Sequence, residues 1–321
     1  MSRKSIPMIS VVMAVYNGQR YLKQAVQSVL TQTCTDFEFI IINDGSTDDS
    51  GQILQKLAEQ DERIHLISQE NHGLTPSLNK GIALARGKYI ARMDADDICL
   101  PQRFAKQSEF LEANPGYVAV GAEVLMIDPE GWAIGLRGHG RTHEEIDARL
   151  LLGDGGAMTH PVVMLKAETL RVIGGYREEF VTTQDLDLFL RLSEVGKLYN
   201  LPDVLLRWRQ HPQSINHTRY QTWKQMKYKA LRDTICRRNI ALDLEQILAV
   251  EPDLKTDHRF SWAEVASRSC HPISAIKNYL LSLFQCGFRR YHASFVRLSC
   301  RDFIHCSTHR IKIYFEDNDK R

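Results

Sequence analysis

Apolar runs alternate with segments of helical periodicity through the first hundred residues of the chain. The apolar runs have the length of strands and lie at residues 8–15, 37–43, 63–68 and 88–93. The segments between them repeat their apolar residues with helical spacing, at 21–32, 50–60 and 76–87. This alternation predicts an α/β fold with a mostly parallel sheet flanked by helices.

The loops that follow these four strands are rich in small and polar residues. Their sequences are, in chain order, YNGQR, NDGSTDD, QENHGL and DADD. Ligands bind to open α/β sheets outside the carboxyl ends of the strands. We therefore expect the four loops to meet at one rim of the sheet and to form a ligand site there.

The later part of the chain is less regular. Two strands joined by a PEG turn are expected within 115–135, and a further strand is expected at 160–166. A helix is expected at 182–196, because apolar residues from Leu186 to Val195 recur at helical spacing.

The charge changes sign along the chain. Residues 1–218 contain 22 Lys and Arg against 28 Asp and Glu, whereas residues 219–321 contain 19 against 11. With 321 residues the chain is long enough for two domains. We predict an α/β domain at 1–218 and a basic, mainly helical C-terminal region at 219–321, with any bound cation in the acidic part.

The cysteines and the N-terminus bear on the compartment. The seven cysteines are scattered and never form a CxxC pair, so neither a disulfide framework nor a zinc site is indicated. The N-terminal sequence MSRKSIPMIS lacks the apolar core of a signal peptide. No apolar run approaches the ~18 residues needed to span a bilayer. These features predict a cytoplasmic protein.

Two common nucleotide-binding motifs are absent. The sequence VYNGQRYL follows the first strand in place of GxGxxG, and no Walker A sequence occurs. Nicotinamide cofactors and NTP hydrolysis of the P-loop type are therefore disfavoured.

The loop NDGSTDDS combines a strand-end acid with the start of a helix. Thr47 or Asp48 is suited to bind the first free amides of the following helix as a cap. Capping does not explain Asp44, which ends the apolar strand and faces the rim. A carboxylate in this place can accept the imide N–H of a uracil.

The stretch IARMDADDICL places Asp94, Asp96 and Asp97 within four positions at a strand end. One reading makes Asp96 and Asp97 caps of a helix expected at 100–114, but one helix does not need three acids. Carboxylates with an acid-x-acid spacing suit Mg²⁺ or Mn²⁺, which take oxygen ligands and keep open positions for phosphate oxygens. This reading predicts a metal that carries a diphosphate.

The motifs together resemble a known enzyme family. In order and spacing, SVVMAVYNGQRYLKQAVQSVLTQT, FEFIIINDGSTDDS, QENHGLTPSLNKGIALARGKYIARMDADD and TTQDLDLFLRL are similar to the family 2 glycosyltransferases with a GT-A fold. The resemblance covers about residues 8–211, and residues 1–218 would then form the catalytic domain. It implies metal-dependent transfer of a sugar, with inversion, from a nucleotide-diphospho-sugar, for which we favour a UDP-sugar.

The resemblance also assigns roles to residues, position by position. It implies that Asp94 lies near the ribose and the metal, that Asp96 is the principal metal ligand, and that Asp185 is the catalytic base. The residues implied around the nucleotide base are Val15, Tyr16, Asn17 and Asp44. The chain departs from the usual pattern at Ala14 and at Gln184, where many members have Pro and Glu.

Transfer with inversion needs a carboxylate that takes the proton of the acceptor hydroxyl. Asp185 is the first candidate for this base. Asp187 is a weaker alternative, because an offset of two residues turns it to another face of the helix.

Three further residues have competing readings. His211 is either a further metal ligand or a diphosphate contact, and Arg209 is a candidate for bidentate phosphate binding. For both, the alternative is a solvated strand end. His160 is expected first as a hydrogen-bonded loop histidine and second as a residue on the acceptor side.

The segment 271–313 mixes apolar and basic residues with helical spacing. Its apolar residues, such as Leu280 and Leu283, are expected first to pack against this protein or a second copy in a homodimer. The second reading is peripheral contact with the inner face of a membrane, since basic amphipathic helices bind anionic lipid.

The acceptor is predicted to be a saccharide or a lipid-linked saccharide, as in cell-surface polysaccharide biosynthesis. Two other functions stay open at this point, namely sugar-nucleotide nucleotidyl transfer and catalytically silent binding of a sugar nucleotide. The sequence motifs do not specify the sugar that is transferred.

Overall fold

The computed structural model describes residues 6–138, 140–211, 220–241, 244–249, 266 and 271–286. The chain forms two compact units. Unit 1 consists of Met1–Val124, Gly138–Trp208 and Ile215–Glu251. Unit 2 consists of Leu125–Arg137, Arg209–Ser214 and Pro252–Arg321.

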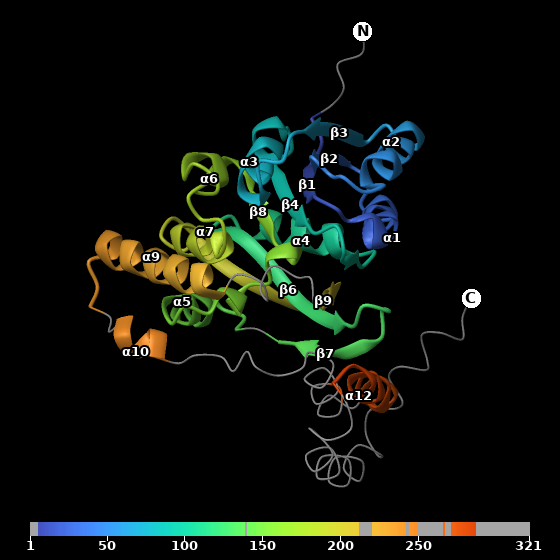
Figure 1. The fold of residues 1–321 in the computed structure, drawn as a ribbon. Helices are drawn as coiled ribbons and strands as arrows, with labels where there is room; N and C mark the ends of the chain where they lie inside the picture. Colours follow the sequence, from blue (N-terminus) through green and yellow to red (C-terminus); the bar gives the residue numbers. More distant parts are fainter. Residues whose placement is uncertain are drawn as a thin grey trace. The chain divides into compact units, whose positions relative to one another are not determined.

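The first part of the sheet is parallel, as predicted. Its strands lie in the order β3-β2-β1-β4 (Figure 1). The bounds of β1 to β4 are Ile9–Val15, Phe37–Asp44, Ile64–Gln69 and Tyr89–Met93. The helices between them are α1, α2 and α3, at Gln19–Leu30, Ser50–Gln60 and Leu74–Leu84. Asp44 at the end of β2 is level with Gln69 at the end of β3, so the following loops begin at the same rim.

The second part of the sheet contains several antiparallel pairs. β8 (Met164–Lys166) pairs with β4, and β6 (Tyr117–Ile127) pairs with β8. β5 (Ile98–Cys99) pairs with β9 (Lys197–Arg209) at the other end of the path, and β7 (Ala133–Arg137) pairs with β6. The predicted α/β class with flanking helices is therefore confirmed, and the sheet is mixed. The tight turn between β6 and β7 is of the kind that only antiparallel neighbours allow.

The remaining helices flank the sheet or extend the chain. They are α4 Arg103–Ala113, α5 His143–Leu151, α6 Ala167–Val172, α7 Gln184–Leu192, α9 Tyr220–Arg238, α10 Leu244–Ala249 and α12 Pro272–Cys286. The helix predicted at 182–196 is thus shorter than expected, and Val195 lies beyond its end and is exposed. The strand predicted at 160–166 exists only in its second half, because a short 3-10 helix with Pro161 precedes β8.

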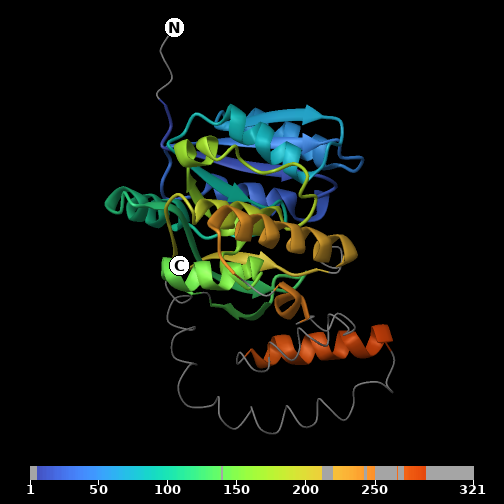
Figure 2. The ribbon, with the colours of Figure 1, turned by 90° about the vertical axis from the view of Figure 1, so that its left-hand side faces the viewer.

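Unit 1 has a hydrophobic core on each face of the sheet. Because side chains alternate along a strand, Val11 and Val12 of β1 belong to different cores. Val11 shares its core with Leu22 of α1 and Phe104 of α4. Val12 shares the other core with Phe189 of α7 and Leu231 of α9. α9 therefore packs in unit 1, and the two views of the chain show it beside α7 (Figures 1 and 2). The predicted boundary near residue 218 stays a prediction.

In unit 2, α12 packs on the hairpin of β6 and β7. Ala275 lies in a small apolar cluster with Ile134 of β7. The buried carboxylate of Asp128 accepts hydrogen bonds from Lys277 Nζ at 2.7 Å and from Asn278 Nδ2 at 3.2 Å. Packing of this helix against the protein, the first reading of the segment, is confirmed for this face of α12.

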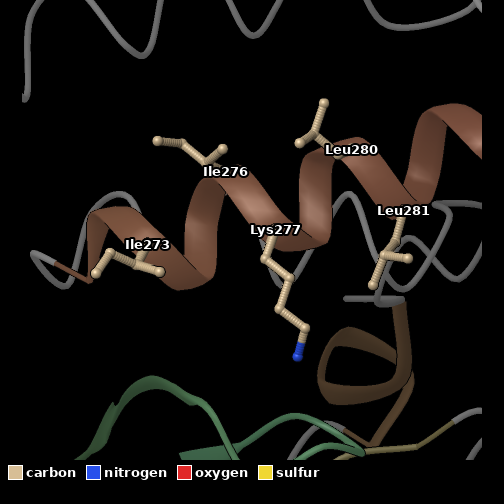
Figure 3. A pocket seen from close by; sticks show the side chains of 5 residues that line it. All are labelled: Ile273, Ile276, Lys277, Leu280 and Leu281. Carbon is tan, nitrogen blue, oxygen red and sulfur yellow. The ribbon is translucent and has the colours of Figure 1, made fainter.

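The opposite face of α12 is apolar and exposed. Ile276 and Leu280 project to the side opposite Lys277 (Figure 3). Ile273, Ile276 and Leu280 are 65%, 46% and 49% exposed. Leu283 and residues 287–313 lie outside the described side chains. Of the helices that the structure describes, none combines the length and apolarity needed to cross a membrane.

Candidate active site

The loop after β1 is tied to the loop after β2. The backbone of Asn17 has a positive φ of 53°, and its side-chain Oδ1 accepts a hydrogen bond from Thr47 N at 2.8 Å. The Asn17 N–H in turn donates to Ser46 Oγ at 3.1 Å. Of the other residues that the resemblance places around the nucleotide base, Val15 is buried and Tyr16 is 54% exposed. The ring of Tyr16 is therefore accessible, whereas the Asn17 side chain fixes the loop.

Asp48 has the capping role predicted for Thr47 or Asp48. Its Oδ1 accepts a hydrogen bond from the N–H of Ser50, the first residue of α2, at 2.9 Å. Its Oδ2 accepts one from Gln19 N at 3.1 Å, at the start of α1. One carboxylate thus binds one backbone N–H at the start of each of two helices.

Asp44 is buried at the end of β2 and organises the loop after β3. Its carboxylate accepts hydrogen bonds from Gln69 Nε2 (2.8 Å), His72 N (2.9 Å) and Gly73 N (2.8 Å). Burial alone would raise the pKa of Asp44, but these hydrogen bonds outweigh it and lower the pKa. Gly45 is needed beside it, because a Cβ there would lie 2.7 Å from Asn71 N and φ is 71°.

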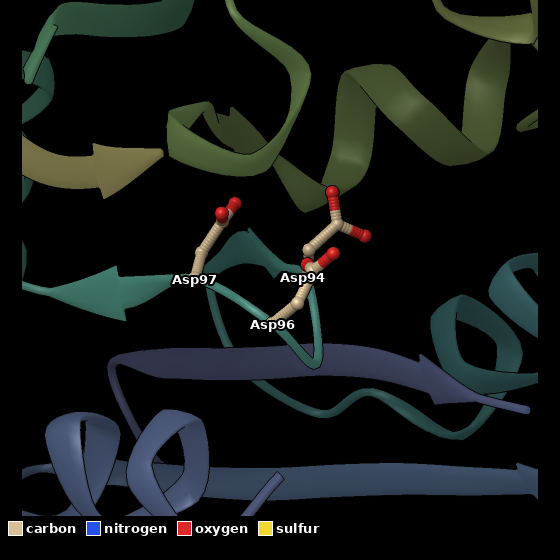
Figure 4. Close-up of side chains that lie close together, drawn as sticks. All are labelled: Asp94, Asp96 and Asp97. Carbon is tan, nitrogen blue, oxygen red and sulfur yellow. The ribbon is translucent and has the colours of Figure 1, made fainter. Parts of the chain in front are cut away.

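The three aspartates of DADD form a cluster. Each offers a carboxylate oxygen, and the oxygens of Asp94, Asp96 and Asp97 lie within 4.8 Å of one another. Figure 4 shows the three side chains on the loop between β4 and β5, with the carboxylates of Asp94 and Asp96 beside each other. The alternative that these acids cap α4 is wrong, since the N-cap of that helix is Gln102 and no side chain caps it.

Arg92 was not identified from the sequence as a site residue. It lies in β4 two residues before Asp94, is only 3% exposed, and forms an ion pair through Nη1 with Asp94 Oδ1. Burial opposes its charge, but Asp94 and Tyr176 outweigh this effect and raise the pKa of Arg92. The sequence did contain a signal for this role, namely an arginine within the apolar strand IARM. A charge in a buried strand needs a partner of opposite charge.

Asp185 lies at the start of α7, after Thr183 in the left-handed region at φ 58°. Its Oδ1 accepts the N–H of Leu186 at 2.9 Å. Burial raises the pKa of Asp185, with a further contribution from Asp94, although the Leu186 N–H and the Arg92 guanidinium lower it. The same arginine therefore acts electrostatically on the DADD cluster and on Asp185.

His160 and Tyr176 form a buried pair near Arg92. His160 Nε2 lies 2.6 Å from the Tyr176 hydroxyl. Burial and the Arg92 charge hold the pKa of His160 well below its usual range, and burial raises the pKa of Tyr176. Both side chains are neutral at pH 7, and the hydrogen-bonded state of His160 agrees with its first reading.

Asp187 is placed differently from Asp185, although two residues separate them. It is 1% exposed, and Arg177 and Arg191 bind its two carboxylate oxygens. Arg177 also reaches Asp233 of α9 at 2.9 Å. The predicted difference in helix face is confirmed, and Asp187 joins α7 to the preceding loop and, through Arg177, to α9.

Arg209 and His211 belong to unit 2. Arg209 is buried, and its Nη1 donates to Pro129 O at 3.0 Å and to Asp128 O at 3.3 Å in the turn between β6 and β7. It is therefore not a solvated strand end. His211 is half-buried.

A mixed α/β sheet with an acidic cluster after β4 and a separate carboxylate on α7 defines the GT-A class of sugar transferases. The chain belongs to glycosyl transferase family 2, whose family model matches residues 10–165. It is thus a glycosyltransferase, and the resemblance found in the sequence motifs is confirmed.

Named relatives support this membership. A putative glycosyltransferase EpsE of Bacillus subtilis is 36% identical over 209 residues, which are 64% of this chain and 73% of the relative. The O-antigen biosynthesis glycosyltransferase WbnJ of Escherichia coli is 32% identical over 244 residues, or 75% of this chain and 94% of the relative.

Solved structures show the same fold. The S. aureus TarS 1-349 structure in complex with UDP-GlcNAc has a TM-score of 0.60 at 16% identity, covering 88% of this chain and 93% of TarS 1-349. The mannosyltransferase PcManGT of Pyrobaculum calidifontis, in complex with GDP-Man and Mn²⁺, has a TM-score of 0.53 at 16% identity. The match covers 92% of this chain and 80% of the PcManGT chain. At this identity the likeness concerns the fold alone.

Proposed function

We propose that the protein is a metal-dependent inverting transferase that moves a sugar from a nucleotide-diphospho-sugar to a hydroxyl of a saccharide or lipid-linked saccharide in polysaccharide biosynthesis. The observation that carries this proposal is the presence of two acidic sites of different character, joined by Arg92. One is the DADD cluster, and the other is Asp185 with its raised pKa.

The DADD cluster fits a divalent cation. Carboxylate oxygens are the ligands that Mg²⁺ and Mn²⁺ prefer, and oxygens within 4.8 Å of one another need only small shifts to reach one ion. Asp96 and Asp94 would hold the ion, with Asp97 beside them. A cation bound there supplies positive charge that stabilises a diphosphate leaving group. His211 is proposed as a further ligand or diphosphate contact.

Asp185 is proposed as the base that takes the proton of the acceptor hydroxyl. The acceptor oxygen forms the new bond to the anomeric carbon, and the bond from that carbon to the diphosphate oxygen breaks. The nucleoside diphosphate leaves with the electron pair, and inversion follows from attack on the opposite face. A raised pKa suits this task, because a base works best when its pKa approaches the working pH. Neither nucleotidyl transfer nor silent binding gives Asp185 such a role.

On the donor side we propose that Tyr16, Val15 and Asn17 border the nucleotide base. Asp44 would accept the imide N–H of that base, if it is uracil. A carboxylate has about four acceptor positions, and three hydrogen bonds occupy the Asp44 carboxylate. The Ser77 hydroxyl also contacts this carboxylate, so the uracil N–H would compete with these partners. Arg209 is proposed as a phosphate contact, in competition with its bonds to two carbonyl groups.

The donor proposal is tested by thermal unfolding with nucleotide sugars, because a ligand of the native state raises the apparent stability. UDP-GlcNAc with Mn²⁺ is expected to give a larger shift than GDP-mannose with Mn²⁺, and the shift should shrink without the metal. Equal shifts with the two donors would contradict the uracil contact of Asp44.

The exposed apolar face of α12 supports a second, separate proposal, that the C-terminal region contacts the membrane surface peripherally. The basic residues of the tail would add attraction to anionic lipid. Sedimentation with anionic liposomes should then fall steeply with salt, since charges are screened over ~10 Å at 0.1 M. Salt-independent dimerisation without liposome binding would assign this face to a homodimer.

A further inference from the structure

Lys227 of α9 is a buried cation for which the proposed reaction has no role. The residue is 8% exposed, and its ammonium donates no hydrogen bond within the described parts of the chain. It lies against Gly153, where an added Cβ would approach Lys227 Cε to 2.1 Å and Nζ to 2.8 Å. The lack of a side chain at Gly153 therefore makes room for this lysine.

The charges around Lys227 are not balanced. Burial lowers the pKa of Lys227, and the carboxylate of Asp154 opposes this only in part. That carboxylate is already engaged by Arg149, at 3.0 Å from Nε and 2.6 Å from Nη2, and by Gly156 N at 2.9 Å. Two cations thus lie near one carboxylate, which already binds Arg149. An anion bound at this point would remove the imbalance.

The glycine-rich loop Gly153–Gly156 lies next to both Lys227 and the proposed base. A Cβ added at Gly155 would lie 4.0 Å from each carboxylate oxygen of Asp185. Gly153, which contacts Lys227, is only two residues away, a span of at most ~7 Å. The same short loop therefore borders both Lys227 and the proposed base.

An aromatic ring accompanies the lysine. Trp223 precedes Lys227 by one helical turn, and Lys227 Nζ lies 5.2 Å from the centre of its ring. Aromatic side chains with a few placed polar groups are typical linings of small-molecule sites. Trp223 and Lys227 together offer one flat apolar surface and one positive charge.

We propose that Lys227, with Trp223 and the loop Gly153–Gly156, binds an anionic group, a carboxylate or a phosphate, on the acceptor saccharide. This inference rests on the proposed function, since it places the acceptor beside Asp185. The ammonium would form a charge-assisted hydrogen bond with the anion. The site would thereby select acidic over neutral acceptors.

The test compares matched probes by NMR titration of the full chain. Methyl β-glucuronide is paired with methyl β-glucoside, and glucose 6-phosphate is paired with glucose, so that each pair differs in one anionic group. Wild type is expected to bind at least one anionic probe about tenfold more tightly than its neutral partner, equivalent to one charge-assisted contact. The pair that shows the larger preference distinguishes a carboxylate from a phosphate.

The matched variants are Lys227→Met and Lys56→Met. Lys56 lies exposed on α2, so its replacement changes the net charge equally and leaves the site intact. Lys227→Met should abolish the anionic preference, and Lys56→Met should keep it. Lys227→Arg, which keeps the charge, should retain part of it.

Equal binding of anionic and neutral probes by wild type, or an undiminished preference in folded Lys227→Met, would overturn the proposal. Binding of UDP with Mn²⁺ is measured on the same proteins. If wild type does not bind UDP with Mn²⁺, the proposed function is contradicted. If wild type binds UDP normally but shows no preference for anionic probes, only the Lys227 proposal is contradicted.

Discussion

The loops after β1, β2 and β3, here called the donor loops after their proposed role, and the α7 region of unit 1 are held in place by different interactions. In the donor loops, side chains such as Asn17, Asp44 and Asp48 accept hydrogen bonds from backbone N–H groups. Around α7, Asp187 is held by arginine side chains that come from α7 and from the preceding loop. The donor loops therefore depend on many weak local bonds, and the position of the proposed catalytic base depends on a few buried charges.

The largest effect on stability is expected for the buried charges. Asp187→Asn removes the carboxylate between Arg177 and Arg191 and should lower the free energy of unfolding by about 3–5 kcal/mol, the usual loss when one partner of a buried ion pair is removed. Chemical denaturation measures it. The control is Glu112→Gln, whose pair with Lys88 is largely exposed and should contribute little to stability. Equal losses of unfolding free energy in the two variants would contradict the expected difference between the buried and the exposed ion pair.

A smaller effect is expected in the donor loops. Asp48→Ala frees the N–H groups of Ser50 and Gln19 and should cost about 0.5–2 kcal/mol, as for other helix caps. Asp49→Ala is the matched control, because Asp49 is the N-cap residue by position and its side chain makes no capping hydrogen bond. The same denaturation experiment should show almost no change for it. A greater loss of unfolding free energy for Asp49→Ala than for Asp48→Ala would contradict the assignment of the cap to Asp48.

The parallel half of the sheet could be predicted because its pattern is local. Each strand and helix from β1 to β4 is marked by its own periodicity, and the loops at the rim follow from the parallel order. The second part of the sheet depends on pairings between distant segments, such as Ile98 with Arg207, which periodicity does not encode.

The candidate site divides in the same way. Asp44, Asp94 and Asp96 stand in contiguous motifs, and the structure brings Asp94 and Asp96 together. The contribution of Arg92 to Asp185 became visible only in the structure, because 93 positions separate them. The alternative reading of Asp96 and Asp97 as caps was wrong, because the helix that they were expected to cap begins several residues later.

The central claim is that the DADD cluster binds donor and metal while Asp185 acts on the acceptor. The most direct measurement pairs calorimetric binding of UDP with Mn²⁺ and the rate of sugar transfer, on Asp96→Asn and Asp185→Asn. Asp96→Asn should weaken metal-dependent binding, because an amide carries no charge to offset the cation.

Asp185→Asn should leave that binding nearly intact while the transfer rate falls by roughly 10² to 10⁴, the typical contribution of a general base. Near-normal transfer by Asp185→Asn, or an equal loss of UDP binding in the two variants, would contradict the account.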